Sequence, residues 1–213
     1  MRPYSFRDQC IALVDTAIQT VFPEPKRTTP RENPGAVIPE HSLTSRQKQH
    51  AAGLMRVNHA GEVSAQALYQ GQALVARKEA IRDHLQHAAA EEVDHLAWCE
   101  QRLSELESTT SRLNPLWYSA SFVIGALAGL AGDRISLGFL AETEEQVTRH
   151  LQSHLYSLPA EDLKSRAIVK QMAIDENSHA LSAYAHGGVA LPDVIRTVMR
   201  WGSKLLTKSS YYV

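Results

Sequence analysis

Cysteine is scarce in this chain, and its scarcity excludes several kinds of metal and redox site. Cys10 and Cys99 are the only cysteines among 213 residues, and neither belongs to a Cys-x-x-Cys pair. Rubredoxin-like, zinc-finger and iron–sulfur sites held by cysteine are therefore excluded. Two isolated thiols suit a reducing compartment. The first residues lack an apolar run followed by a small-residue cleavage site, so we expect no secretory signal and a cytoplasmic location.

The chain also lacks a strong charge of one sign and the alternating pattern typical of β-strands. Lys and Arg number 22 and Asp and Glu number 23, which gives a net charge of −1, so we expect no nucleic-acid partner. A hydrophobic fraction of 44% excludes wholesale disorder. Apolar residues recur instead with helical periodicity, which predicts an all-α protein.

Helical periodicity divides the chain into a small N-terminal part and a larger domain. Residues 5–22 predict an amphipathic helix, and residues 23–39, which contain five prolines, predict a linker. We therefore expect residues 1–44 to form an N-terminal helix and a Pro-rich linker. Residues 45–213 are expected to form one helical domain that ends in an amphipathic helix.

The larger part predicts four long helices. No proline interrupts residues 46–113, and one helix of that length is unusual, so we expect two antiparallel helices with a turn near residues 76–82. The third helix is expected over residues 134–156. The fourth is expected over residues 160–185, with Pro159 fitting its first turn.

A stretch without charge lies between the second and third of these helices. The seventeen residues 116–132 contain no charged side chain, which is marginal for a transmembrane span. They predict either a buried crossover or a segment at a membrane interface. Four helices with one long hydrophobic crossover form a ferritin-like bundle, here with extra N- and C-terminal helices.

Two of the predicted helices carry the same Glu-x-x-His unit. Glu92 and His95 form one unit, and Glu176 and His179 form the other, 84 residues later. This spacing places both side chains on one helix face, so a carboxylate oxygen and an imidazole nitrogen can reach the same ion. Each unit interrupts an apolar stripe that should face the core, where an unpaired carboxylate is costly and needs a cation.

The other two helices each place one glutamate on the inner stripe. Glu62 lies 30 residues before Glu92, and Glu144 lies 32 residues before Glu176. In each antiparallel helix pair the two glutamates are about equally far from the connecting turn, so their side chains lie at the same level of the pair. Four glutamates and two histidines facing inward are the ligands of di-iron or di-manganese bundle proteins. The oxygen-rich set disfavours copper, and zinc would not need six ligands.

The spacing leaves open which glutamates would bridge two metal ions. We expect Glu92 and Glu176, because each Glu-x-x-His helix lies at the centre of the site. Residues beside the ligands are candidates to support them, because a ligating histidine usually donates its other N–H to a carboxylate. These candidates are His59, His150, Asp175, Glu91 and Asp94. The histidines expected to be solvated are His84, His87 and His154.

The run LMRVNHAGE, from Leu54 to Glu62, resembles the LxRVxHAGE signature of the demethoxyubiquinone hydroxylase (Coq7) family. The EVDH, EEQV and DENSH runs match the remaining motifs of that family in order and spacing, from about residue 45 to the C-terminus. The metal ligands of that family correspond here to Glu62, Glu92, His95, Glu144, Glu176 and His179.

The resemblance implies a di-iron quinol monooxygenase with two iron ions per chain. Such an enzyme uses O₂ to hydroxylate a polyprenylated methoxy-methyl-benzoquinol, demethoxyubiquinol, to demethylubiquinol in ubiquinone biosynthesis. The sequence has no Gly-x-Gly-x-x-Gly nucleotide-binding motif, so electrons must come from a partner, from the quinol itself or from reduced nicotinamide. The resemblance also points to other quinone-synthesis proteins as partners, and a homo-oligomer is left open.

A substrate with an isoprenoid tail resides in the bilayer, so we expect peripheral attachment to the cytoplasmic face of the cell membrane. The uncharged residues 116–132 include aromatic side chains that suit an interface. Near the C-terminus, Arg196, Arg200, Lys204 and Lys208 recur every four residues, away from an apolar stripe. This pattern is typical of a helix that binds a lipid surface. A helix that caps the bundle with a solvated basic face is the alternative.

Two other classes of function are consistent with parts of the pattern. A ferritin-like ferroxidase or a rubrerythrin-like peroxidase would use similar ligands. However, a ferroxidase needs no apolar crossover, and a rubrerythrin normally carries a Cys-x-x-Cys module. A non-catalytic helical lipid-binding protein would leave six inward-facing polar residues unexplained.

Overall fold

The computed structural model describes residues 6–23 and 31–213, and helices form all the regular structure of these residues. The all-α prediction is thus confirmed. Residue 5 of the predicted N-terminal helix and residues 24–30 of the predicted linker lie outside the described part of the chain. The helices are α1 (Phe6–Val21), α2 (Ser45–Val75), α3 (Glu79–Glu105), α4 (Asn114–Leu130), α5 (Asp133–Ser157), α6 (Leu163–Ala185) and α7 (Asp193–Ser210).

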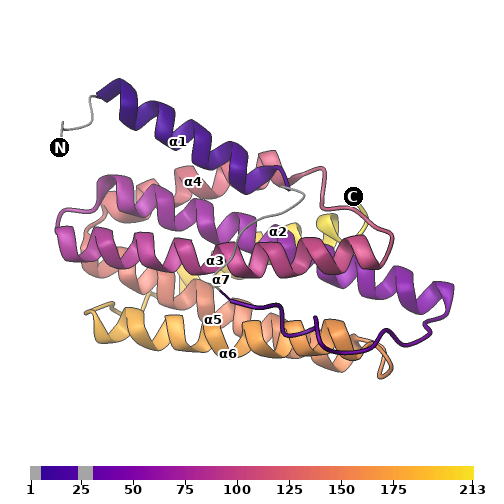
Figure 1. Cartoon of the computed structure of the whole chain (residues 1–213). Helices are drawn as coiled ribbons and strands as arrows, with labels where there is room; N and C mark the ends of the chain where they lie inside the picture. The colour runs from indigo at the N-terminus through magenta and orange to yellow at the C-terminus, as the bar shows by residue number, and fades with distance from the viewer. Residues whose placement is uncertain (1–5, 24–30) are drawn as a thin grey trace.

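Helices α2, α3, α5 and α6 form a four-helix bundle. Helix α2 pairs with α3 and α5 pairs with α6, and α4 runs along α2 to connect the two pairs (Figure 1). This long connection is the crossover of a ferritin-like bundle, as predicted. Helix α1 contacts α2 and α4, and helix α7 contacts α2 and α5. The metal-ligand candidates therefore lie on four helices that surround one core.

The crossover helix packs very closely on α2 along one side. A Cβ atom on Gly125 would lie 2.1 Å from the carbonyl oxygen of Leu68, so only a glycine lets the two backbones approach this far. The other side of α4 exposes Leu116, Val123 and Leu127, whose side chains are 58%, 56% and 61% exposed. The uncharged segment is therefore a crossover with one buried side and one exposed apolar side.

The start of α6 differs from the prediction. Pro159 was expected in its first turn, but the helix begins at Leu163, after a short loop. Asp162 fixes this start, because its carboxylate accepts a hydrogen bond of 3.0 Å from the backbone N–H of Ser165. The side-chain cap thus outweighs the preference of proline for a first helical turn.

The described part of the predicted linker packs against the bundle. Within residues 31–44, the Glu40 carboxylate pairs with the Arg102 guanidinium at 2.7 Å, and the Asn33 amide donates to the Gln101 side chain at 2.9 Å. Residues 31–44, which we call the N-terminal strap, therefore lie fixed along α3 and α6.

The surface carries apolar side chains on three helices outside the bundle. Besides the exposed side of α4, helix α7 exposes Val198, Trp201 and Leu205. Helix α1 exposes an apolar stripe formed by Ile11, Val14 and Ile18. Among the described helices, none has both the length and the apolar character needed to cross a membrane.

Candidate metal centre

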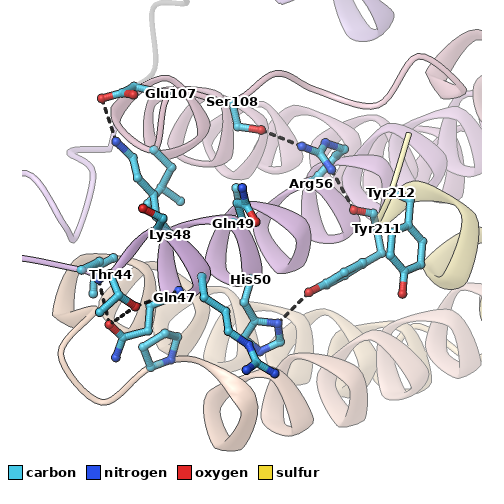
Figure 2. Close-up of a pocket in the computed structure, with 16 residues that line it drawn as sticks. Thr44, Gln47, Lys48, Gln49, His50, Arg56, Glu107, Ser108, Tyr211 and Tyr212 are labelled. Carbon is cyan, nitrogen blue, oxygen red and sulfur yellow. Dashed lines mark hydrogen bonds and ion pairs between the residues drawn. The ribbon is translucent and has the colours of Figure 1, made fainter.

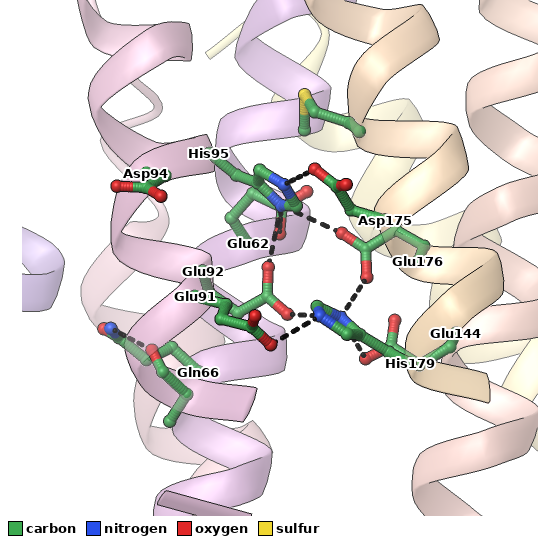
Figure 3. Close-up of polar contacts among 12 residues, drawn as sticks. Glu62, Gln66, Glu91, Glu92, Asp94, His95, Glu144, Asp175, Glu176 and His179 are labelled. Carbon is green, nitrogen blue, oxygen red and sulfur yellow. Dashed lines mark hydrogen bonds and ion pairs between the residues drawn. The ribbon is translucent and has the colours of Figure 1, made fainter. Parts of the chain in front are cut away.

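The structure brings all six predicted ligands together in the middle of the bundle (Figure 3). Each of the four bundle helices contributes at least one of them, because the inner stripe of each helix reaches the same level of the core. His179 is 12% exposed, and the other five side chains are almost fully buried. Helix α2 supplies Glu62, α3 supplies Glu92 and His95, α5 supplies Glu144, and α6 supplies Glu176 and His179.

The six side chains form two overlapping groups of four. In one group, donor atoms of Glu62, Glu92, His95 and Glu176 all lie within 4.8 Å of one another. In the other group, the same holds for Glu92, Glu144, Glu176 and His179. Glu92 and Glu176 belong to both groups. The geometry could therefore hold two cations side by side, with these two carboxylates between them.

The histidines face the carboxylates through their Nδ1 atoms. His95 Nδ1 lies 2.9 Å from Glu92 Oε2 and 3.0 Å from Glu176 Oε1. His179 Nδ1 lies 3.1 Å from Glu176 Oε2. Both Nδ1 atoms thus point into the cluster and are placed to bind a metal ion, which leaves both Nε2 atoms for other partners.

The electrostatics of the cluster are those of a site that needs positive charge. Burial, together with repulsion from Glu176, raises the pKa of Glu62 and of Glu144 well above the usual value. Burial alone would lower the pKa of His179, but hydrogen bonds to Glu176 and Glu92 raise it to about 12. Without a cation, protons must therefore compensate the buried carboxylates.

Unsatisfied oxygens in the cluster fit metal ions. Glu144 Oε2 is buried and accepts no hydrogen bond from any residue that the structure describes, and the buried Glu92 Oε1 lies 3.4 Å from His179 Nδ1, at the limit of hydrogen-bond distance. The other oxygen of Glu144 accepts a hydrogen bond from the Tyr69 hydroxyl. Buried carboxylate oxygens without partners are costly, and a hard cation would satisfy them. The residues present therefore fit an oxygen-rich two-metal site.

Two of the predicted supporting residues contact the histidines. His95 Nε2 lies 3.0 Å from Asp175 Oδ2, and His179 Nε2 lies 2.9 Å from Glu91 Oε2. A carboxylate behind a ligating histidine fixes the tautomer and the orientation of its ring. The cluster thus has one such carboxylate for each histidine, both supplied by the opposite Glu-x-x-His helix.

The other three predicted supporting residues make different contacts. His59 Nε2 lies 3.1 Å from Glu100 Oε1. Asp94 is buried, with its carboxylate 3.9 Å from the Arg31 side chain. His150 lies in the wall of an apolar cavity, described below, rather than behind a ligand.

The expectation of solvated histidines holds for His87 alone. His84 is half-buried, and its ring stacks on that of His186 with centroids 4.2 Å apart. His87 is 76% exposed, as expected. His154, in contrast, is buried and pairs with Asn58 Oδ1 at 2.7 Å, and its ring meets that of His150 with centroids 3.9 Å apart. The helical periodicity of α5 does not reveal the contact between His154 and Asn58, because Asn58 belongs to α2.

An apolar cavity of about 450 Å³ reaches the cluster between α2, α4, α5 and α7. Glu62 belongs both to its lining and to the cluster. Most of the lining is apolar, including Leu68, Ile124 and Met199. The sequence does not reveal this cavity, because its walls come from separate helices, each with an ordinary apolar stripe.

A larger polar cleft of about 1120 Å³ lies at the start of α2, and no residue of the cluster lines it (Figure 2). Its polar groups are paired with one another. Lys48 pairs with Glu107 at 2.7 Å, and His50 Nδ1 lies 2.7 Å from the Tyr211 hydroxyl. Arg56 donates to the backbone oxygen of Tyr211 at 2.7 Å. The cleft thus marks where the C-terminus is tied to α2.

Comparisons with known proteins agree on one family. Residues 49–210 match the family model "Ubiquinone biosynthesis protein COQ7". A relative from Legionella pneumophila (strain Paris), named 3-demethoxyubiquinol 3-hydroxylase, is 56% identical over 213 residues, which cover 100% of both chains. Relatives with the same name come from Polynucleobacter asymbioticus, 54% identical over 98% of this chain and 100% of its own, and Pseudomonas putida (strain GB-1), 51% identical over 100% and 98%. The chain therefore belongs to the COQ7 family of ubiquinone biosynthesis proteins.

Proposed function

We propose that this chain is a 3-demethoxyubiquinol 3-hydroxylase, which uses O₂ to hydroxylate a polyprenylated methoxy-methyl-benzoquinol. The observation that carries the proposal is the apolar cavity that ends at Glu62, because it places space for a lipidic ring against the carboxylate cluster. A ferroxidase that handles hydrated iron would have no use for such a cavity. The names of the relatives support the same reaction.

The metal centre in this proposal consists of two iron ions. Glu62 and His95 would hold one ion, and Glu144 and His179 would hold the other. Glu92 and Glu176, which belong to both groups, would lie between the two ions. Iron bound in such a site supplies the activation of O₂ that no amino-acid side chain can provide. The protein holds the ligands in place, excludes water from the buried core and orients the quinol.

His150 is the residue that we propose to orient the quinol ring. Burial lowers the pKa of this histidine to about 4, so its imidazole is neutral at physiological pH. Its Nε2 atom is buried in the wall of the cavity and has no hydrogen-bond partner among the described residues. A quinol hydroxyl in the cavity would satisfy this atom.

We also propose that the protein attaches peripherally to the cytoplasmic face of the cell membrane. The exposed apolar sides of α4 and α7 support this, together with the basic side chains of α7. Liposome flotation with anionic vesicles tests it. Replacing Leu127, Trp201 and Leu205 with serine should reduce binding strongly, whereas unchanged flotation would contradict the attachment.

The reaction is tested by anaerobic iron loading followed by an assay with O₂ and a short-tail demethoxyubiquinol. We expect two iron ions per chain and a hydroxylated product. Glu144→Gln should abolish turnover, whereas Glu145→Gln, one residue further along α5 with its side chain 32% exposed, is the matched control and should retain it. A wild-type chain that binds two irons and oxidises them but leaves the quinol unchanged would favour a ferroxidase.

A further inference from the structure

The N-terminal strap reaches the back of the metal centre from outside the four-helix bundle. The strap precedes the residues that match the COQ7 family model, which begin at residue 49. It runs along α3 and α6, the two helices that carry the histidines (Figure 1). Glu40 anchors its later part, since it pairs with Arg102 at 2.7 Å and with Lys164 at 3.3 Å. Its first described residue is Arg31.

Arg31 is fixed by three contacts close to His95. Its Nη2 atom donates to Asp175 Oδ2 at 2.7 Å. Its guanidinium lies over the ring of Trp98, with 4.9 Å between the guanidinium carbon and the ring centroid. Its Nε atom is 3.9 Å from the buried carboxylate of Asp94. An arginine held in this way presents a rigid positive charge rather than a mobile one.

The same oxygen of Asp175 links Arg31 to the cluster. Oδ2 of this residue accepts the bond from Arg31. The same oxygen lies 3.0 Å from His95 Nε2 (Figure 3). The carboxylate is 15% exposed and the Arg31 side chain is 36% exposed, so water screens the contact from the Arg31 side only. Arg31 therefore fixes both the position and the negative charge of the group that orients His95.

The other half of the cluster lacks this arrangement. His179 Nε2 has an equivalent partner in Glu91, at 2.9 Å. The Glu91 side chain, however, is 39% exposed, and the basic group beside its other oxygen, among the described residues, is His87, 3.8 Å away and 76% exposed. The two halves of the site thus match in their ligands but differ in what holds the carboxylate behind each histidine.

We propose that Arg31 is a positioning residue that makes the two metal positions unequal, so that the ion beside His95 is held more tightly than the ion beside His179. This inference rests on the proposed function, because it assumes that the cluster binds iron. Loss of a group that orients a ligand typically weakens metal binding by about 10- to 100-fold. Arg31 acts one step further out, through Asp175, so we expect an effect near the lower limit, about tenfold.

Release of Fe²⁺ from the full-length chain measures this inequality directly. The protein is loaded anaerobically with two Fe²⁺ and mixed with excess chromogenic chelator, and the absorbance is followed over time. The wild type should release iron in two phases of equal amplitude. Arg31→Gln should accelerate the slow phase about tenfold and leave the fast phase unchanged, while Arg31→Lys should restore part of the difference.

Two further variants show which half of the site each phase reports on. Glu91→Gln should accelerate the fast phase alone, because its carboxylate supports His179. Arg149→Gln removes an arginine on α5 that pairs with Glu145 at 3.5 Å, and it should leave both phases unchanged. Melting temperatures of the metal-free variants within about 2 °C of the wild type would exclude a general loss of stability.

The outcomes separate the two proposals. A wild-type chain that binds no Fe²⁺ would overturn the proposed function. A wild type that binds two irons and releases them in one phase would overturn the inequality. Two phases that Arg31→Gln leaves unchanged would overturn the role of Arg31 while the proposed function stands.

Discussion

Gly61 offers a test in which stability and activity should move in opposite directions. This residue lines the apolar cavity, directly before Glu62, and a Cβ atom added to it would meet no atom within 4 Å. It lies inside α2, where glycine is less favourable than other residues by about 0.5–1 kcal/mol. Gly61→Leu should therefore raise the free energy of unfolding by about that amount, because its Cβ atom meets no other atom and the rest of the side chain has the cavity beside it.

The leucine side chain would extend into space that we assign to the quinol. A substrate forced against a filled cavity meets a cost of about 1–3 kcal/mol, so kcat/KM should fall about 5- to 150-fold. Iron content should stay at the wild-type value. Gly61→Ala is the control, because it gains the same helix propensity while filling much less of the cavity.

Urea denaturation, iron analysis and steady-state kinetics with a short-tail demethoxyubiquinol measure the three quantities. A Gly61→Leu variant that is more stable and has unchanged kcat/KM would refute the assignment of the cavity to the substrate. A variant that is less stable than the wild type would refute the geometry, because it would mean that the space beside Gly61 is occupied.

Three further predictions concern the metal centre, the strap and the crossover. Metal ligands must be deprotonated, so iron loading should release up to four protons per chain. These protons should come from the four groups with raised pKa: Glu62, Glu144, His95 and His179. Calorimetry in buffers of different ionisation enthalpy measures the number released. Apparent metal affinity should accordingly rise with pH. Release of no protons on iron loading would contradict this prediction. In the metal-free chain, His179 contributes stability that is fully present below its unfolded pKa of 6.5. This stability should be lost as pH rises towards the folded pKa of about 12. Arg102→Met should cost about 3–5 kcal/mol in urea unfolding, because it leaves the buried carboxylate of Asp162, now 2.9 Å from the guanidinium, without its cation; a cost below about 1 kcal/mol would mean that the pair is dispensable. Gly125→Ala should destabilise the fold by about 1–3 kcal/mol although alanine favours helix, because its Cβ would meet the Leu68 backbone oxygen at 2.1 Å; an unchanged melting temperature would contradict the close packing.

The helices and the six clustered side chains could be predicted because both depend on periodicity. Two residues at i and i+3 on an apolar stripe face the same side of a helix. When two residues are equally far from the turn of a helical hairpin, their side chains lie at the same level of the hairpin. Glu92 and Glu176 are expected to bridge for a different reason, that each Glu-x-x-His helix lies at the centre of the site, and the structure includes both in each group of four. These inferences required no knowledge of which neighbour a helix meets.

The turn between α2 and α3 illustrates what periodicity cannot supply. Residues 76–78 contain neither glycine nor proline, so nothing in the local sequence marks the turn. The backbone N–H groups of Arg77 and Lys78 instead donate to the carboxylate of Asp133, at 3.1 and 3.2 Å. The residue that stabilises the turn lies more than fifty positions later. The strap is also held by a residue that is distant in the sequence, because Arg31 donates a hydrogen bond to Asp175.

The repeat in the sequence also conceals a difference between the two sides of the metal centre. The ligands are nearly symmetric, but the surroundings are not: the cavity meets the cluster at Glu62, on the side of α2 and α5, whereas the strap covers the histidine helices α3 and α6. If the quinol occupies the cavity, substrate and strap act on opposite sides of the same ions. Gly61→Leu should then alter quinol kinetics without altering iron release, and Arg31→Gln should alter iron release without altering the KM for the quinol. A variant on either side that changed both quantities together would mean that the bundle transmits strain across the centre, and the independence of the two sides would have to be abandoned.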